Sequence, residues 1–294
     1  MKLQGIYPAL ITCFQENGDV YKTKILQNIR KLNRIALSGY TVCGSTGESP
    51  LMNFSEKLEV MDCVREAASE GKTLIAGVGY DSVRETVRLA NKAAELGYQF
   101  ALALTPHYYK NQMQRTDVQS LYYRAVADQC KIPVLIYNMP AVTGYDIPVE
   151  ALAELSHHPN IVGMKDSSGN IEKLEATIKA VKPGFQVMSG SGATFGRALE
   201  IGAAGAILAI ANAVPYACVT IWEAFRTRQH EAARDWQSRL QPAAKIVPAK
   251  YGIAGLKYAM DLKGYYGGPP RYPLMPPSAE IRTEIEQALD GVNS

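Results

Sequence analysis

The sequence predicts an α/β protein, a (β/α)8 TIM barrel followed by a C-terminal helical extension. Short apolar segments alternate with amphipathic helical segments along most of the chain. The apolar segments are continuous runs, as expected for parallel strands that are buried on both faces. Beyond residue 209 only helical patterns remain. A doubly wound sheet is the alternative fold, but Thr12-Cys13-Phe14-Gln15 follows the first strand where that fold usually has a Gly-rich fingerprint.

The eight expected strands are short apolar runs that end at glycine, proline or polar residues. In chain order they cover residues 7–12, 39–44, 73–78, 99–104, 132–138, 161–164, 185–190 and 204–209. A helical segment follows each of them, which is the connection that parallel strands require. This regular succession favours a closed barrel.

The helices between the strands are expected from apolar residues at helical spacing. They cover residues 24–37, 55–68, 82–96, 117–129, 148–155, 171–181 and 194–201. Ser55 and Ser82 stand where helices begin, Pro148 is placed at a helix start, and Gly97 is placed at a helix end. These start and stop residues agree with the alternation of strands and helices.

The C-terminal part contains four further helical patterns, at residues 215–227, 231–240, 248–262 and 278–289. Residues 264–273 are too rich in glycine and proline for regular structure. We therefore expect two units: a barrel over residues 1–212, and C-terminal helices over residues 213–294 that pack on it.

Composition narrows the range of functions. The chain has 294 residues, of which 47% are hydrophobic and 20% charged, as in ordinary globular proteins. Its net charge of +3 has no basic block, which argues against a nucleic-acid partner. A signal-peptide pattern and a membrane-spanning apolar run are not found, and the 5 cysteines form no CxxC pair, so a cytoplasmic protein is expected. The 4 histidines lack metal-ligand spacing, and neither a metal nor another cofactor is expected.

Candidate catalytic residues stand at the carboxyl ends of the strands, where such barrels carry their chemistry. Lys165 ends the sixth strand. Burial disfavours the ammonium form of a lysine and leaves a neutral amine that can attack a carbonyl. Taken alone, a lysine here is more often a solvated residue at a strand end, since most lysines lie on the surface. Tyr137 ends the fifth strand, where a phenol can relay protons or simply fill the end of the barrel.

Two turns at the same end of the barrel are suited to bind a substrate. Residues 44–47 (Gly-Ser-Thr-Gly) offer hydroxyls and backbone N–H groups to a carboxylate or phosphate, or form only a tight connection. Residues 189–192 (Ser-Gly-Ser-Gly) either bind phosphate or keep the backbone, at Gly190, close to a substrate or a neighbouring strand. With a lysine and a tyrosine, these turns favour imine chemistry on a 2-oxo acid, which breaks or forms a carbon–carbon bond without a metal.

Four motifs identify a family resemblance. They lie at residues 44–48 (Gly-Ser-Thr-Gly-Glu), 105–108 (Thr-Pro-His-Tyr), 137–140 (Tyr-Asn-Met-Pro) and 163–166 (Gly-Met-Lys-Asp). With them the chain resembles the dihydrodipicolinate synthase/N-acetylneuraminate lyase family of Schiff-base aldolases over nearly its whole length. The resemblance implies pyruvate as one half of the substrate and a homotetramer built from two tight dimers.

The resemblance also implies roles for individual residues. Lys165 forms the imine with pyruvate, and Tyr137 is the proton donor and acceptor. Ser45 links Tyr137 to Tyr108 in a proton relay, with Tyr108 reaching in from a neighbouring subunit. Thr46 holds the carboxylate of the pyruvyl group through its side chain and its backbone N–H.

The resemblance also implies which residues contact the substrate. Ile207 contributes a backbone contact from the eighth strand. Dihydrodipicolinate synthases carry an arginine two residues past the proline of Tyr-Asn-x-Pro, and it binds the carboxylate of the aldehyde. Here Val142 stands at that position, and a valine cannot make such a bidentate contact.

Other segments resemble the 4-hydroxy-2-oxoglutarate aldolase branch of the family, namely residues 105–109, 159–167 and 264–269. In that branch Ser167 is expected near the distal part of the substrate, whereas Asn usually stands where this chain has Thr46. We therefore expect a class I aldolase acting on a 2-oxo acid, with 4-hydroxy-2-oxoglutarate as the leading substrate. Dihydrodipicolinate synthase, sialic acid lyase and 2-keto-3-deoxy sugar acid aldolase activities stay open. Alternatives outside this chemistry are a 2-oxo acid binding or regulatory barrel and a phosphate-binding barrel enzyme.

Overall fold

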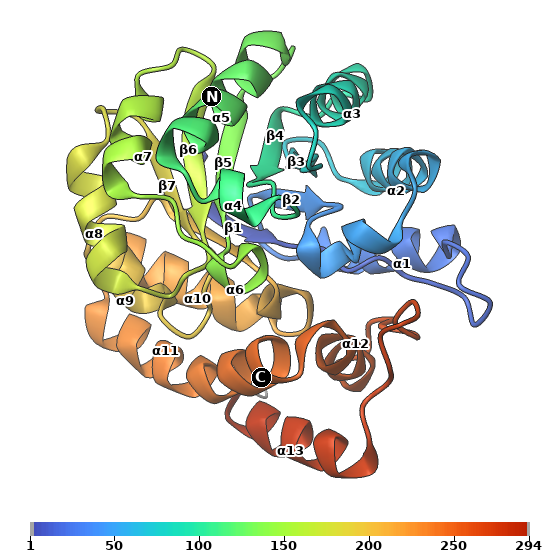
Figure 1. Cartoon of the computed structure of the whole chain (residues 1–294). Helices are drawn as coiled ribbons and strands as arrows, with labels where there is room; N and C mark the ends of the chain where they lie inside the picture. The colour runs from blue at the N-terminus through green and yellow to red at the C-terminus, as the bar shows by residue number, and fades with distance from the viewer. Residues whose placement is uncertain (1–2, 293–294) are drawn as a thin grey trace.

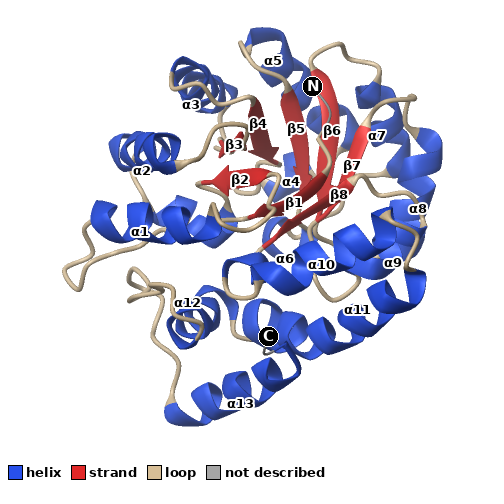
Figure 2. Cartoon of the chain, turned by 180° about the vertical axis from the view of Figure 1, so that it is seen from behind, coloured by secondary structure: helices blue, strands red, loops and turns tan. Residues whose placement is uncertain are grey.

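Eight parallel strands form a barrel with helices around it (Figures 1 and 2). The computed structural model describes residues 3–292. The strands are β1 (Gly5–Pro8), β2 (Gly39–Val42), β3 (Thr73–Gly77), β4 (Phe100–Leu104), β5 (Val134–Asn138), β6 (Ile161–Asp166), β7 (Gln186–Ser189) and β8 (Gly205–Leu208). They are hydrogen-bonded in the order β1-β8-β7-β6-β5-β4-β3-β2, and a bridge between Ala9 and Thr41 joins the β1 and β2 edges. The predicted (β/α)8 fold is confirmed.

The surrounding helices follow the predicted alternation. They are α1 (Lys22–Leu32), α2 (Phe54–Ala67), α3 (Val83–Glu95), α5 (Thr116–Gln129), α7 (Val149–Ser156), α8 (Ile171–Ala180) and α9 (Phe195–Glu200). Ser82 caps α3 as expected, accepting the Glu85 N–H at 3.2 Å. Helix α2 begins earlier than predicted because Asn53, and not Ser55, caps it in a capping box with Glu56.

Some local predictions were wrong. The first strand covers residues 5–8 and not 7–12, because its ladder partners on β8 are Gly205–Leu208. Two short helices, α4 (Lys110–Met113) and α6 (Pro140–Thr143), interrupt segments for which no regular structure was predicted. An apolar run in the sequence indicates a buried segment but not the residue at which strand pairing ends. A helix of one turn is too short to show apolar residues at helical spacing.

Side chains on the strands alternate between the barrel interior and the layer beneath the helices. The interior cluster contains Tyr7 of β1, Tyr137 of β5, Met188 of β7 and Ile207 of β8, all buried. Met164 belongs instead to the larger cluster between strands and helices. Lys165, the next residue in β6, therefore faces the interior beside Tyr137, which is its partner in the ladder.

The C-terminal helices are α10 (Pro215–Arg226), α11 (His230–Ala244), α12 (Gly252–Leu262) and α13 (Ala279–Leu289). Figure 1 shows α11 to α13, orange to red, along one side of the barrel. The helix expected from Pro248 begins at Gly252, because Pro248 lies in a π-helical turn, Lys245–Lys250. Proline removes a hydrogen bond inside a helix, and π turns are local interruptions of α-helical structure. Helix α10 packs against β1, and the division at residue 212 stays a prediction.

The irregular segment 264–273, which we call the return segment, leads from α12 back to the barrel. Arg271 donates its backbone N–H to Glu48 Oε2 at 2.8 Å and its guanidinium to Glu56 Oε1 at 2.6 Å. Lys257 Nζ lies 2.6 Å from Glu48 Oε1 and donates to the Pro269 carbonyl at 2.8 Å. Burial lowers the pKa of Lys257, and the Glu48 carboxylate opposes that shift. The extension thus contacts the turn that follows β2. Among residues 3–292, no helix is long and apolar enough to cross a membrane.

Candidate active site

Lys165 and Tyr137 lie side by side at the carboxyl ends of β6 and β5. They are partners in the parallel ladder, and each is 4% exposed. Lys165 Nζ lies 4.2 Å from the centroid of the Tyr137 ring. Among the residues that the structure describes, no carboxylate forms an ion pair with Lys165. The strand thus presents a buried amine beside a phenol, without a counter-ion among the described residues.

A cavity of about 260 Å³ opens beside Tyr137 at this end of the barrel. Ser45 and Tyr137 both line it, together with His107 and Lys57. The Tyr137 hydroxyl donates to Met139 Sδ at 2.9 Å. The cavity brings Ser45 and Tyr137 to one space, while the proton relay through Ser45 stays a prediction.

Ser45 and Thr46 belong to a 3-10 turn, Ser45–Gly47, which is fixed from both sides. The Gly47 N–H donates to the Gly44 carbonyl at 3.0 Å, and Thr12 Oγ1 donates to the Gly47 carbonyl at 2.7 Å. The residues that flank this stretch, Cys43 and Glu48, both have a φ of 57°. Left-handed backbone at residues other than glycine is uncommon and is found where surrounding contacts enforce it. The turn is thus held in shape by its surroundings.

Gly190 brings its backbone close to the lysine. Its N–H donates to the Asp166 carbonyl at 2.6 Å. A Cβ at this position would lie 2.0 Å from Ser167 Oγ and 3.0 Å from Lys165 Cε. Glycine is therefore required for Lys165 and Ser167 to keep their positions. The predicted substrate contact Ile207 is fully buried in the interior cluster, in the ladder opposite Tyr7.

Tyr108 lies apart from these residues within its own chain. It is 76% exposed and packs edge-on against Tyr109, with the ring centroids 5.2 Å apart. Its backbone N–H donates to Asp81 Oδ1 at 3.1 Å. The side chain is thus available to another subunit, and the predicted contribution across an interface stays a prediction.

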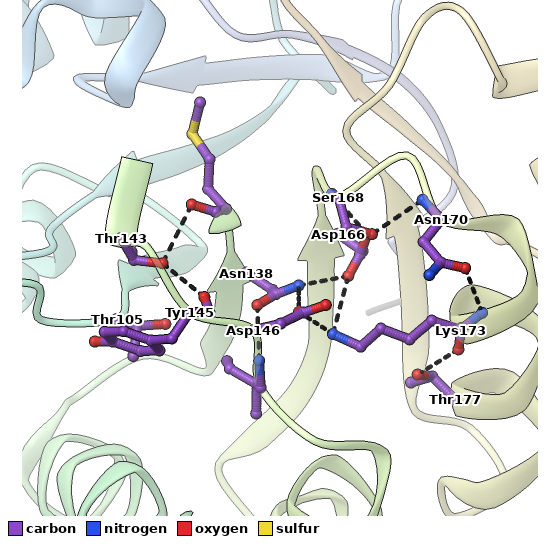
Figure 3. A network of polar contacts seen from close by, with 12 residues as sticks. Thr105, Asn138, Thr143, Tyr145, Asp146, Asp166, Ser168, Asn170, Lys173 and Thr177 are labelled. Atoms are coloured by element: carbon purple, nitrogen blue, oxygen red, sulfur yellow. Dashed lines mark hydrogen bonds and ion pairs between the residues drawn. The ribbon is translucent and has the colours of Figure 1, made fainter. Parts of the chain in front are cut away.

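A polar network lies behind the two strand ends and was not predicted from the sequence (Figure 3). We call Asn138, Asp146, Asp166, Ser168 and Lys173 the strand-end network. Asn138 Nδ2 donates to Asp166 Oδ2 at 2.7 Å and to Asp146 Oδ1 at 2.6 Å. Lys173 forms ion pairs with both carboxylates, and the Ser168 N–H donates to Asp166 at 2.9 Å. Asn138 and Asp166 directly follow Tyr137 and Lys165, so the network joins the two strands that carry them.

Lys57 is a second buried lysine, on α2, that sequence reasoning also missed. It is 2% exposed, lines the cavity and places its Nζ 3.9 Å from the centroid of the Tyr80 ring. Burial lowers its pKa. Cys43 in the same wall is a buried thiol whose pKa is raised by burial to about 12, so it stays protonated at neutral pH. In the sequence Lys57 resembles an exposed lysine, and only its contacts in the folded chain distinguish it.

The fold and this arrangement define a class of enzyme, a carbon–carbon lyase that works through a lysine imine. The chain matches the model of the Dihydrodipicolinate synthetase family over residues 2–291. It is 33% identical over 287 residues to 4-hydroxy-tetrahydrodipicolinate synthase of Methanococcoides burtonii, with 97% of each chain covered. The chain belongs to the dihydrodipicolinate synthetase family, whose members are pyruvate-dependent class I lyases and aldolases.

One relative in sequence has a different name, and two solved dihydrodipicolinate synthases share the fold. A probable mitochondrial 4-hydroxy-2-oxoglutarate aldolase of Emericella nidulans is 35% identical over 290 residues, covering 97% of this chain and 93% of the relative. The crystal structure of dihydrodipicolinate synthase from Aquifex aeolicus has a TM-score of 0.92 and 28% identity, covering 98% of this chain and 97% of that one. A pyruvate complex of the enzyme from Acinetobacter baumannii has a TM-score of 0.93 and 26% identity, covering 98% of both chains. The comparisons establish the pyruvate-dependent chemistry and leave the second half of the substrate to be determined.

Proposed function

We propose that the chain is a class I aldolase for a 4-hydroxy-2-oxo acid, with 4-hydroxy-2-oxoglutarate as the leading substrate. The observation that carries the proposal is the buried amine of Lys165 against the Tyr137 ring, with no carboxylate paired to it among the described residues. Support for the particular substrate comes from Val142, which stands where dihydrodipicolinate synthases have arginine, and from the similarity to the Emericella nidulans protein.

The proposed reaction begins with attack of the Lys165 amine on the C2 carbonyl. Loss of water gives a protonated imine, which withdraws electrons from the adjacent carbon. Tyr137 accepts the proton of the C4 hydroxyl, the C3–C4 bond breaks, and its electron pair moves into the imine as an enamine. Glyoxylate leaves from 4-hydroxy-2-oxoglutarate. Protonation of the enamine at C3 and hydrolysis then release pyruvate and restore the amine.

Binding of the two substrate carboxylates is proposed to use opposite sides of the site. The Ser45–Gly47 turn holds the pyruvyl carboxylate with hydroxyl and backbone N–H donors, as in other anion-binding turns. Ser167 lies beside Lys165 and Gly190 and offers a neutral hydroxyl to the distal part of the substrate. A complete site is proposed to need Tyr108 of the partner subunit in a homotetramer. We place the enzyme in the cytoplasm on the basis of its reduced, buried cysteines.

Borohydride reduction in the presence of pyruvate tests the imine. We expect a pyruvyl adduct on Lys165 in the peptide mass spectrum and no adduct in the Lys165→Arg variant, because a guanidinium is not a nucleophile at this pH. An adduct on another residue, or none at all, rejects the proposal. A coupled pyruvate assay over 4-hydroxy-2-oxoglutarate, sialic acid and deoxy sugar acids then identifies the cleaved substrate.

The alternatives predict different outcomes of the same experiments. A barrel that only binds 2-oxo acids forms the adduct yet releases no pyruvate from any member of the panel. A dihydrodipicolinate synthase condenses pyruvate with a carboxylate-bearing aldehyde and leaves 4-hydroxy-2-oxoglutarate intact. A phosphate-binding enzyme using residues 189–192 forms no imine and is inhibited competitively by inorganic phosphate.

A further inference from the structure

The loop of residues 139–147, between β5 and α7, is tied to the rest of the site by a few polar contacts. At its start Met139 accepts the Tyr137 hydroxyl, and at its end the Ile147 N–H donates to Asn138 Oδ1 at 3.2 Å. Tyr145 donates its hydroxyl to the Pro106 carbonyl, and Asp146 pairs with Lys173. Val142 lies on this loop. The loop therefore begins at the phenol of Tyr137 and ends on the strand-end network.

Lys173 is the cation of the strand-end network, and it offsets one of the two carboxylate charges. Asp146 and Asp166 bind the same Asn138 amide nitrogen, at 2.6 and 2.7 Å. Two carboxylates this close repel each other. The Lys173 ammonium pairs with both. The Lys173 and Asp166 side chains are only 12% and 4% exposed, so water screens this pair weakly, whereas the Asp146 side chain is 41% exposed and its charge is partly screened. Lys173 is thus the cation that holds Asp146 of the loop next to Asp166 of β6.

Loss of the Lys173 charge would move the loop and leave the strand in place. Asp166 is the last residue of β6, which is hydrogen-bonded to β5 on one side and to β7 on the other. Asp146 has no such ladder and is held by its contacts with Asn138 and Lys173. Repulsion between the two carboxylates would therefore push the loop away from the strand that carries Lys165.

We infer that Lys173 is a positioning residue for carbon–carbon bond cleavage, acting through the loop and not through the imine. The inference rests on the proposed aldolase function. Lys165 and the Ser45–Gly47 turn, which bind the pyruvyl half, do not depend on the loop. Met139 at the loop's start accepts the hydroxyl of Tyr137, which takes the C4 hydroxyl proton, and Val142 lies within the loop. Lys173 therefore sets the geometry in which the C3–C4 bond breaks.

Two partial reactions separate these roles. In solvent deuterium, the imine of pyruvate loses a methyl proton to a base, and the electron pair moves into the imine as an enamine. The enamine then takes a deuteron from solvent, so that pyruvate gains deuterium without any aldehyde. Cleavage of the complete 2-oxo acid needs the same imine and, in addition, the correct placement of the loop.

The experiment compares both reactions in Lys173→Met. We expect kcat/KM for cleavage of the best substrate of the panel to fall by about 10²-fold, the loss typical of a misplacement near 1 Å, while pyruvate exchange stays within about twofold. Lys173→Arg should restore most of the cleavage, because it keeps the charge. Lys179→Met is the matched control, on the same helix with a side chain 72% exposed, and should change neither reaction.

Further variants separate positioning from simple destabilisation. Asp146→Asn removes the loop's charge, so it should lower cleavage less than Lys173→Met and also spare exchange. Combined with Lys173→Met it removes the repulsion and should recover part of the lost cleavage. The inference is overturned if exchange falls in parallel with cleavage, or if Lys173→Met cleaves normally. Failure of the wild-type chain to exchange pyruvate protons would instead reject the proposed function itself.

Discussion

Lys165 and Asp166 are neighbours in the chain but lie in opposite environments. Lys165 faces the barrel interior and the Tyr137 ring, whereas Asp166 contacts Asn138, Ser168 and Lys173 behind the strand. The cause is the alternation of side chains along a strand. One strand end therefore places an amine beside Tyr137 and, at the next residue, an anchor for the strand-end network.

Gly190 is a residue at which a single methyl group should lower the activity. In Gly190→Ala the new Cβ would meet Ser167 Oγ at 2.0 Å and the Asp166 carbonyl at 2.9 Å. Ser167 and Lys165 must shift, so we expect kcat/KM for cleavage to fall by about 10²-fold. Steady-state kinetics and trapping of the imine measure the effect.

Gly291→Ala is the matched control for that variant, because its Cβ meets nothing closer than the Arg239 carbonyl at 3.4 Å. It should keep wild-type kinetics. A Gly190→Ala enzyme with unchanged kcat/KM would contradict the close approach of this backbone to the lysine.

Lys57 should lower the stability of the protein near neutral pH. Because burial lowers its pKa, the folded chain holds this proton less tightly than the unfolded chain does. The loss of folding stability is therefore complete at pH values below the lowered pKa of Lys57. It disappears as the pH rises toward 10.5, the ordinary pKa of a lysine. We expect Lys57→Met to raise the free energy of unfolding at pH 7 by about 1 kcal/mol, and this gain to shrink with rising pH.

Urea unfolding at a series of pH values measures the difference in the free energy of unfolding between Lys57→Met and the wild-type chain. Lys179→Met, at a site where the side chain is 72% exposed, should show no gain at pH 7. A gain for Lys57→Met that grows with pH would contradict the assignment of a buried ammonium.

At the scale of elements, we expect the loop that contains α6 to determine which aldehyde the enzyme accepts. Val142 is 44% exposed, so an arginine there has room and remains solvated. Val142→Arg should favour condensation of pyruvate with succinic semialdehyde over butanal by about tenfold, because a guanidinium binds a carboxylate through two hydrogen bonds. The ratio of the two kcat/KM values is the measurement.

Val142→Leu serves as the uncharged control and should leave that ratio unchanged. Equal ratios in Val142→Arg and Val142→Leu would show that the loop does not face the aldehyde.

The elements that could be predicted from the sequence are those with a long apolar signal. The barrel strands after the first, and the helices around them, follow from continuous apolar runs and from helical spacing. The ladder of β1 depends on its pairing with β8, which no local pattern shows. The π turn at Lys245–Lys250 and the short helix α6 depend on tertiary packing, and Pro248 gave a misleading start signal.

At the scale of the whole molecule, the C-terminal extension fixes the turn that carries Ser45 and Thr46. Lys257→Met would leave the Glu48 carboxylate buried without its cation. We expect a loss of about 3–5 kcal/mol in the free energy of unfolding, together with a higher KM for pyruvate. Denaturant unfolding and pyruvate kinetics provide the two measurements.

Glu48→Gln combined with Lys257→Met removes both charges and should recover most of the stability. Lys250→Met breaks an exposed ion pair with Glu284 in the same extension and should change neither quantity appreciably. An unchanged pyruvate KM in a folded Lys257→Met protein would show that the extension does not shape the turn.

The site could be predicted from the sequence only where its residues follow strands. Lys165, Tyr137, Ser45 and Gly190 stand at strand ends, and the structure gathers them at one end of the barrel. Other charged residues that shape the site stand on helices, as Lys57, Lys173 and Lys257 do. In the sequence they resemble solvated lysines, and only their burial and partners in the folded chain distinguish them.

The single bridge between Ala9 and Thr41 has a consequence for local opening of the fold. Every other neighbouring pair of strands shares a ladder of two or more residue pairs, whereas β1 and β2 meet at this bridge, where the Leu10 N–H donates to the Thr41 carbonyl at 2.8 Å. Separation of the two edges there costs fewer hydrogen bonds, so the Leu10 amide should exchange with solvent deuterium sooner than amides inside the other ladders. The Ser45–Gly47 turn follows β2 directly, and a bound carboxylate should slow that exchange through its binding energy.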